Sequence, residues 1–190
     1  EATARQEDSM FGKKTPPPPK LPLPLQILCV DYVIDGQLAD TIEDGLTRPW
    51  LMRLGNPAVE TVRGVLPLSQ ARVQATGPRA TPARTAEQFN VWFQNIIAVL
   101  PGEAVGQQQI VTWAKDSLRK RAVRGVFYVG PYVISGTALT KETEFALSLV
   151  HLVAVLDATI YGTGPGALLP ELRSPAMLLS TDRMIGFEQA

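Results

Sequence analysis

Hydrophobic and β-branched residues occur along this chain in short runs that Gly and Pro interrupt, a pattern typical of a mainly β protein. The first such run, residues 26–34, ends at Asp35-Gly36, a dipeptide that favours a hairpin turn. Both faces of the strand predicted over this run are apolar, so we expect another layer of structure to cover each of them. The run over 65–75 predicts a second strand, and the polar residues 76–87 that follow it predict a loop.

The next apolar run has hydrophobic residues at alternate positions over 89–100, which predicts a strand that stops at Pro101-Gly102. Residues 107–121 contain no helix breaker and carry apolar side chains on one helical stripe, so they predict a helix. Strand patterns resume after this helix, over 126–134, 152–161 and 176–187. The predicted fold class is therefore mainly β with a central α-helix.

The later strands resemble the earlier ones. Three segments recur in the same order: Tyr32–Gly36 at Tyr132–Gly136, Ala71–Pro78 at Ala158–Pro165, and Asn95–Val99 at Arg183–Phe187. The offset is 100 for the first pair and 87 and 88 for the others, because the first copy carries a longer insert over about 43–61. We interpret these matches as an internal duplication and predict two tandem small modules, each sheet-like or barrel-like.

This interpretation divides the chain into a Pro-rich tail over 1–20, a first β module over 21–103, a linker helix over 104–124 and a second β module over 125–190. We expect the tail to be disordered, because the Pro16–Pro19 run favours polyproline II and cannot pack as a helix or a central strand. A role of this run as a ligand for a domain with an aromatic groove remains an alternative.

Two segments resemble motifs of a known family. Residues 65–73, Val-Leu-Pro-Leu-Ser-Gln-Ala-Arg-Val, resemble a strand of the form Phe-Ile-Pro-Leu-Thr-Asp-Ala-Arg-Val, and residues 180–185 resemble a closing strand of the form Asn-Arg-Asp-His-Ile. Both are similar to motifs of an uncharacterised family of small bacterial β-rich domains, over about 25–100 and 126–189. The resemblance implies tandem copies of such a domain. It implies no site residue, because no activity is assigned to that family.

The composition is that of an ordinary folding chain, with 45% hydrophobic and 19% charged residues. The 18 basic and 18 acidic side chains balance, so no net charge attracts nucleic acid or an anionic membrane. The single cysteine, Cys29, cannot form an internal disulfide, and the longest apolar run, 145–156, is too short to span a bilayer. The first residues are acidic where a signal peptide would be basic. We therefore expect a cytoplasmic protein with no membrane span.

Few residues offer catalytic or metal-binding chemistry. Cys29 and His151 could formally make a Cys–His nucleophilic pair, but both lie in apolar segments, where we expect structural roles. Two carboxylate pairs could hold a hard cation but are interpreted as solvated surface: Glu43/Asp44 and Glu142/Glu144. We predict no catalytic residue, no metal site and no cofactor.

Two short motifs resemble nucleic-acid or phosphate sites. Residues 92–95, Trp-Phe-Gln-Asn, have the letters of a homeodomain recognition helix, but aliphatic residues follow them in place of arginines. A core β-strand is the better interpretation. Residues 162–166 resemble a phosphate-binding glycine loop, but Pro165 removes one N–H donor and no Lys follows, so we predict a β-turn.

One cluster remains as a candidate binding site for an anionic partner: Lys115, Arg119, Lys120, Arg121 and Arg124. Solvation and complementarity to a helix C-terminus would also explain these charges. Duplicated apolar strands without a polar constellation favour a non-enzymatic scaffold or protein-interaction module that binds a protein partner or self-associates. The alternative is a regulatory domain that binds nucleic acid or a small anion through a basic helix over 115–124.

Overall fold

The computed structural model describes residues 22–38, 65–76, 82–116, 121–140, 152–162 and 171–190. The first half of this part of the chain forms β1 (Leu23–Leu28), β2 (Tyr32–Leu38), β3 (Val65–Ala75), β4 (Arg84–Trp92), the 3-10 helix η1 (Phe93–Asn95) and β5 (Ala98–Pro101). The second half forms β6 (Arg121–Val129), β7 (Tyr132–Thr140), β8 (Leu152–Gly162), β9 (Leu172–Ser180) and β10 (Met184–Gln189). The helix α3 (Ala104–Asp116) lies between the two halves in sequence.

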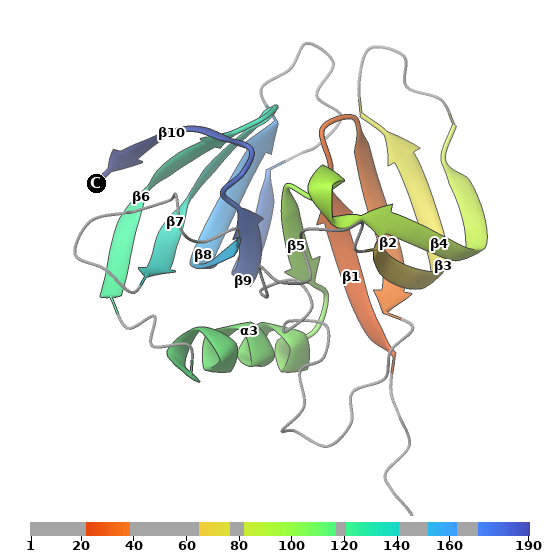
Figure 1. Cartoon of the computed structure of the whole chain (residues 1–190), viewed down its shortest axis with the longest axis horizontal. Helices are drawn as coiled ribbons and strands as arrows, with labels where there is room; N and C mark the ends of the chain where they lie inside the picture. The colour runs from red at the N-terminus through yellow and green to blue at the C-terminus, as the bar shows by residue number, and fades with distance from the viewer. Residues whose placement is uncertain (1–21, 39–64, 77–81, 117–120, 141–151, 163–170) are drawn as a thin grey trace, which may run out of the picture.

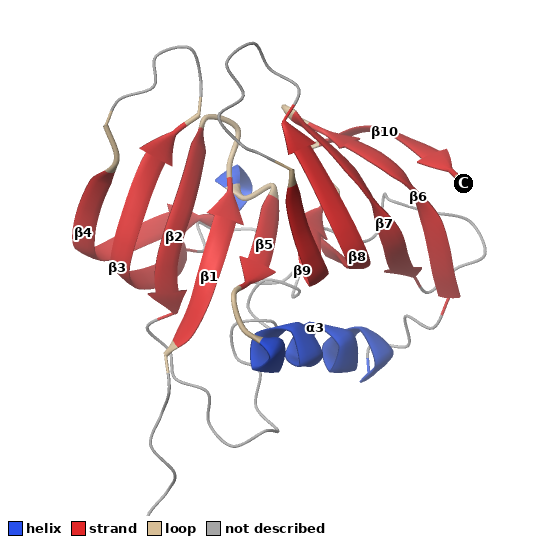
Figure 2. Ribbon diagram, turned by 180° about the vertical axis from the view of Figure 1, so that it is seen from behind, coloured by secondary structure: helices blue, strands red, loops and turns tan. Residues whose placement is uncertain are grey.

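The described strands form one antiparallel sheet in the order β10-β6-β7-β8-β9-β5-β1-β2-β3-β4. The first half contributes the order β5-β1-β2-β3-β4 and the second half the order β10-β6-β7-β8-β9. The two halves meet where β5 pairs with β9, and α3 lies beside this place (Figures 1 and 2). The mainly β class with a central helix is therefore confirmed. The expectation of separate or closed, barrel-like sheets is wrong, because the sheet is continuous and open at β10 and β4.

Strand pairing has the same register in both halves. The sequence offsets are 100 for β1 and β2, 87 for β3, and 88 for β4 and β5. When these offsets are added to two paired residues of the first half, the resulting two residues are paired in the second half. Leu28↔Val33 corresponds to Tyr128↔Val133, and Tyr32↔Ala75 corresponds to Tyr132↔Gly162. Val73↔Arg84 corresponds to Ile160↔Leu172, and Ile27↔Val99 corresponds to Phe127↔Phe187.

Both halves also carry the same irregularity. The pairing of β2 with β3 shifts at Gly36, and the pairing of β7 with β8 shifts at Gly136. The strand opposite each glycine contains a residue with positive φ, Gln70 (φ 49) or Asp157 (φ 48). A Cβ on Gly136 would lie 2.7 Å from Cγ1 of Val155. Glycine at this place therefore lets the facing strand come close at a β-bulge.

The hairpin turn predicted at Asp35-Gly36 is wrong, because the structure has a β-bulge at this place. The turn lies earlier, at residues 29–31, and Asp35 and Gly36 lie inside β2. The run 126–134 likewise contains the end of β6, a turn at Gly130-Pro131 and the start of β7. Gly36 therefore marks a bulge and not the turn, whereas Gly130 does lie in a turn.

Other predicted strands are divided or shifted in the structure. The strand predicted over 89–100 is divided into β4 and β5 by η1, and β4 begins within the predicted loop 76–87. The run 176–187 is divided between β9 and β10. The strand predicted over 65–75 is confirmed as β3, and β8 confirms the one predicted over 152–161.

The predicted helix is confirmed as α3, although it spans Ala104–Asp116 and not 107–121. Ile110, Trp113 and Ala114 are buried on its inner face, and the helix packs on β9, β5 and β8. It therefore covers strands from both halves. Among the helices that the structure describes, none is long and apolar enough to span a membrane. The tail over 1–20 lies outside the described residues.

The buried side chains form two clusters, and each cluster takes residues from both halves. The first contains most of the first half's core, the inner face of α3 and five second-half residues: Leu139, Leu152, Ala154, Ala176 and Leu178. The second contains most of the second half's core and five first-half residues: Leu28, Val33, Ile97, Ala98 and Leu100. Neither half therefore completes its core alone.

Candidate functional site

The candidate basic cluster does not lie on one helix. Lys115 is exposed in the last turn of α3, whereas Arg121 and Arg124 lie in β6, which pairs regularly with β7. Because side chains alternate along a strand, Arg121 and Arg124 point to opposite faces of the sheet. Arg119 and Lys120 lie outside the described residues. The described members of this cluster therefore do not converge on one site.

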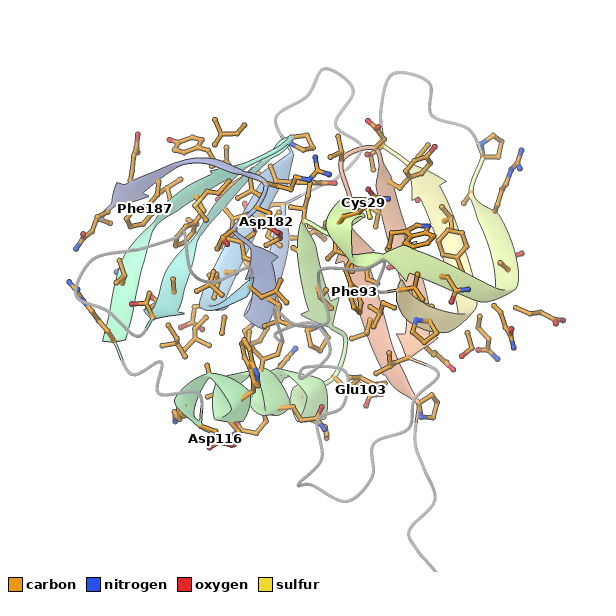
Figure 3. All side chains as sticks on the ribbon, viewed as in Figure 1. Cys29, Phe93, Glu103, Asp116, Asp182 and Phe187 are labelled. Atoms are coloured by element: carbon orange, nitrogen blue, oxygen red, sulfur yellow. The ribbon has the colours of Figure 1, made fainter. Side chains whose placement is uncertain are left out.

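Cys29 is buried where β1 ends, beside the junction of the two halves (Figure 3). Its backbone carbonyl accepts a hydrogen bond from the Tyr132 hydroxyl at 2.9 Å, which links the first half to the second. Burial raises the pKa of the Cys29 thiol to about 11 and that of Tyr132 to about 12. A protonated, buried thiol is a poor nucleophile, and its contacts are those of a packing residue.

The remaining candidates for chemistry lie mostly outside the described residues. These are His151, the carboxylate pairs Glu43/Asp44 and Glu142/Glu144, and all but the first residue of the glycine motif 162–166. Residues 93–95 form η1, so the Trp-Phe-Gln-Asn motif forms neither the recognition helix nor the continuous core strand that we predicted. Within the described part of the chain, no three His, Cys, Asp or Glu side chains gather as metal ligands would.

One hollow of ≈ 380 Å³ lies at the junction, between the ends of β1, β2 and β5 and the start of β9. Its polar side chains already have partners. Gln26 Nε2 donates to Asp35 Oδ1 at 2.8 Å, and Arg173 pairs with Glu171 at 2.7 Å beside it. Both charged side chains of its lining therefore have a partner within the chain, and the Arg173–Glu171 pair is exposed to solvent.

A second hollow of ≈ 340 Å³, which we call the β4-edge hollow, lies between the β1–β2 turn and β4. Its lining is mainly apolar and comprises Cys29, Val30, Asp31, Tyr32, Ile34, Val73, Phe89, Asn90, Val91, Trp92 and Asn95. Three large side chains of this lining are exposed to solvent: Val30, Tyr32 and Trp92.

The sheet ends at β4 on one side and at β10 on the other (Figure 1). Ile185, in β10, is the most exposed of the large hydrophobic side chains in the described part of the chain. Two of the six such residues lie in the edge strands, Trp92 in β4 and Ile185 in β10, and two more, Val30 and Tyr32, line the β4-edge hollow. The sequence pattern predicts core strands at all four positions, so it does not reveal that these side chains are exposed. The alternation that buries Val91 could have placed Trp92 on the opposite face.

At the junction, strands that correspond to the two edge strands are paired with each other. Ala98 and Val99 of β5 lie opposite Leu179 and Leu178 of β9. The Ser180 amide donates to the Ile97 carbonyl at 2.8 Å, which extends this ladder beyond β5. No protein-family model, curated protein or solved structure matches the chain.

Proposed function

We propose that this chain is a non-enzymatic scaffold, built from two copies of one five-strand module, that binds other protein chains through the edges of its sheet. The observation that carries the proposal is the exposure of Val30, Tyr32 and Trp92 at the β4-edge hollow together with Ile185 on β10. Edge strands present unpaired N–H and C=O groups, and natural proteins normally protect them with charges or bulges. The β10 edge has such a bulge at Ile185, where its pairing with β6 shifts, but this bulge exposes a hydrophobic side chain and not a charge. Exposed apolar side chains such as Ile185 and Trp92 are suited to binding.

The duplication is supported by the strand orders β5-β1-β2-β3-β4 and β10-β6-β7-β8-β9, which are the same order within each half. The common register and the bulges at Gly36 and Gly136 also support it. Two unrelated halves would have no reason to place a positive φ at both Gln70 and Asp157. The sequence matches at offsets of 100, 87 and 88 follow the same correspondence.

A non-enzymatic role is supported by the state of the polar groups. The Cys29 thiol is buried and its pKa is raised, which disfavours the thiolate that nucleophilic catalysis requires. Asp35 and Arg173, at the junction hollow, are occupied by Gln26 and Glu171. In the described part of the chain, these side chains act as structural partners for one another.

The test is association of the purified full chain, measured by sedimentation velocity at low and high salt over a wide range of concentration. Edge pairing and apolar contact predict association that salt does not weaken. A domain that binds nucleic acid or a small anion through Lys115, Arg119, Lys120, Arg121 and Arg124 predicts a monomer whose retention on heparin falls steeply with salt. That second result would replace the scaffold by the anion-binding alternative.

A further inference from the structure

The junction inside the chain joins the fourth strand of one half to the fifth strand of the other, since β9 pairs with β5. The two edges of the described sheet are formed by the remaining fourth strand and the remaining fifth strand. β4 is the fourth strand of the first half, and β10 is the fifth strand of the second half. One chain therefore contains one completed junction and the two separate sides of another.

Corresponding side chains differ sharply in exposure between the junction and the edges. Ile97 is 0% exposed at the junction, whereas Ile185, at the corresponding position of β10, is 78% exposed. Tyr132 is 2% exposed and Tyr32 is 48% exposed. Ser180 is 6% exposed and Trp92 is 44% exposed. The free edges thus expose the positions that the junction covers.

The β4-edge hollow has a filled counterpart at the junction. The residues that correspond to its lining include Val129, Tyr132, Ile134, Ile160, Met177 and Leu179, and all of these belong to the second buried cluster. Ile97, the residue directly before β5, belongs to the same cluster. In the first half the corresponding space is the open hollow of ≈ 340 Å³, and the chain's own Ile185 lies at the opposite end of the sheet.

We propose that a second copy of this chain binds at the β4-edge hollow, with its β10 paired antiparallel to β4 and its Ile185 side chain in the hollow. The inference rests on the proposed function and names the partner as the chain itself. The junction register, transferred by the offset of 88, places Val91 opposite Gly186 and Asn90 opposite Phe187 of the next copy. Trp92 then lies opposite Ile185.

The junction also fixes the polar contacts of this pairing. The Ser180 amide donates to the Ile97 carbonyl at 2.8 Å, so the Trp92 amide donates to the Ile185 carbonyl of the next copy. The Tyr132 hydroxyl donates to the Cys29 carbonyl at 2.9 Å, so the Tyr32 hydroxyl reaches the carbonyl of Val129 in the next copy. At the position of Gly130 the first half has Val30, which is exposed and lines the hollow. A Cβ at Gly130 would lie 3.1 Å from Cδ1 of Ile97, so in this pairing Ile185 of the next copy packs closely against Val30.

Because β4 and β10 are different surfaces, the contact is head-to-tail. Head-to-tail contacts form a ring when the rotation from copy to copy closes and a filament when it does not. In a ring every copy uses both of its edges, whereas a filament leaves one β4 and one β10 free at its two ends. The assembly has a direction along the sheet in both cases.

The first experiment compares Ile185→Lys with Val105→Lys in the full chain. Val105 is also a large exposed hydrophobic residue, but it lies on α3, away from both edges. Ile185→Lys should weaken association by roughly tenfold or more, because it replaces the side chain that fills the hollow by a charge. Val105→Lys should associate as the wild type does, and both variants should keep the wild-type melting temperature of the monomer.

The second experiment uses a double variant, Trp92→Cys with Ile185→Cys, both at exposed positions. Mild oxidation should give a ladder of covalent oligomers on a non-reducing gel. The pair Val105→Cys with Ile185→Cys is the matched control and should give no ladder. Cys29 is present in both and is buried.

A salt-insensitive association that Ile185→Lys leaves unchanged would overturn the edge pairing while the scaffold proposal stands. A wild-type chain that stays monomeric, together with a double-cysteine variant that gives no ladder, would also overturn it. If that monomer is retained on heparin in a salt-dependent way, the scaffold proposal fails as well. A discrete mass or a growing series of masses, each lost in Ile185→Lys, supports the pairing as a ring or as a filament.

Discussion

The junction between the halves and the outer edges of the sheet are built from corresponding strands, yet one is buried and the others are open. At the junction β5 and β9 share a ladder, and the side chain of Ile97 is buried. At the edges β4 and β10 each pair with one other strand of the described part of the chain, and Ile185 is exposed. The burial of these corresponding side chains therefore depends on whether the fourth strand of one half pairs with the fifth strand of the other, and not on the local sequence pattern.

The largest effect is expected when the junction is removed altogether. Residues 21–103 expressed alone should self-associate or aggregate, because Leu28, Ile97 and Leu100 lose the second-half cluster that buries them. The full chain should unfold as one cooperative unit in urea. A 21–103 fragment that is monomeric and nearly as heat-stable as the full chain would show that each half completes its own core.

Truncation of corresponding isoleucines should separate the two environments. Ile97→Ala should lower the free energy of unfolding by roughly 2–5 kcal/mol, because it leaves a cavity in a closed core. Ile185→Ala should change the unfolding of the monomer by less than about 0.5 kcal/mol. Both values come from urea unfolding at a concentration where the chain is monomeric. Equal losses would contradict the assignment of Ile185 to a free edge.

The bulge glycines give a smaller contrast. A Cβ at Gly136 would lie 2.7 Å from Val155 Cγ1 and 2.9 Å from the Leu156 carbonyl, whereas the nearest atoms at Gly36 are 3.2 Å away, in the Leu68 side chain. Gly136→Ala should therefore cost roughly 1–3 kcal/mol of stability, and Gly36→Ala should cost less. Thermal unfolding of the two variants measures the difference, and the reverse order would mean that the bulges are not packed as described.

Alkaline pH should weaken the junction by a comparable amount. Burial raises the pKa of Cys29 from 9.0 to about 11, and that of Tyr132 from 10.0 to about 12. Because the unfolded chain loses these protons first, stability should hold below about pH 9 and fall as the pH rises toward 12. Each group accounts for up to roughly 2–3 kcal/mol at full effect.

Urea unfolding across this pH range measures the loss, and Cys29→Ala identifies the share that the thiol contributes. That variant should be less stable at neutral pH by about 1 kcal/mol, because it leaves a small cavity. Its stability should fall less steeply between pH 9 and 11. Native Cys29 should also react slowly with thiol reagents at neutral pH, and rapid stoichiometric labelling would contradict its burial.

The sequence predicts elements whose signals are local. β3 is bounded as expected, because Thr76 and the glycine and proline after it end the apolar run, and α3 is found from its apolar stripe. The hairpin turn at residues 29–31 is missed, because Val30 and Asp31 do not form a typical turn dipeptide. Gly36 suggested a turn, although the close approach of β3 is what requires it there.

The candidate site could not be predicted in the same way. Alternation along 89–100 shows which residues share a face, but pairing partners depend on strands far away in the sequence. Whether Trp92 is covered depends on whether a fifth strand lies beside β4. For the basic residues, closeness in sequence is misleading. Arg121 and Arg124 lie on opposite faces of the sheet because both are in β6.

The covalent link between the halves has an arithmetic consequence. Each chain brings two five-strand units to the sheet, already joined at β5 and β9. Any ring closed by pairing of β4 with β10 must then contain an even number of units, and odd rings are excluded whatever angle the units prefer. If the preferred rotation between neighbouring units suited an odd ring, the contacts would have to distort to close an even ring, or the assembly would remain an open filament. Linkage of the units in pairs thus restricts the sizes of assembly that are available.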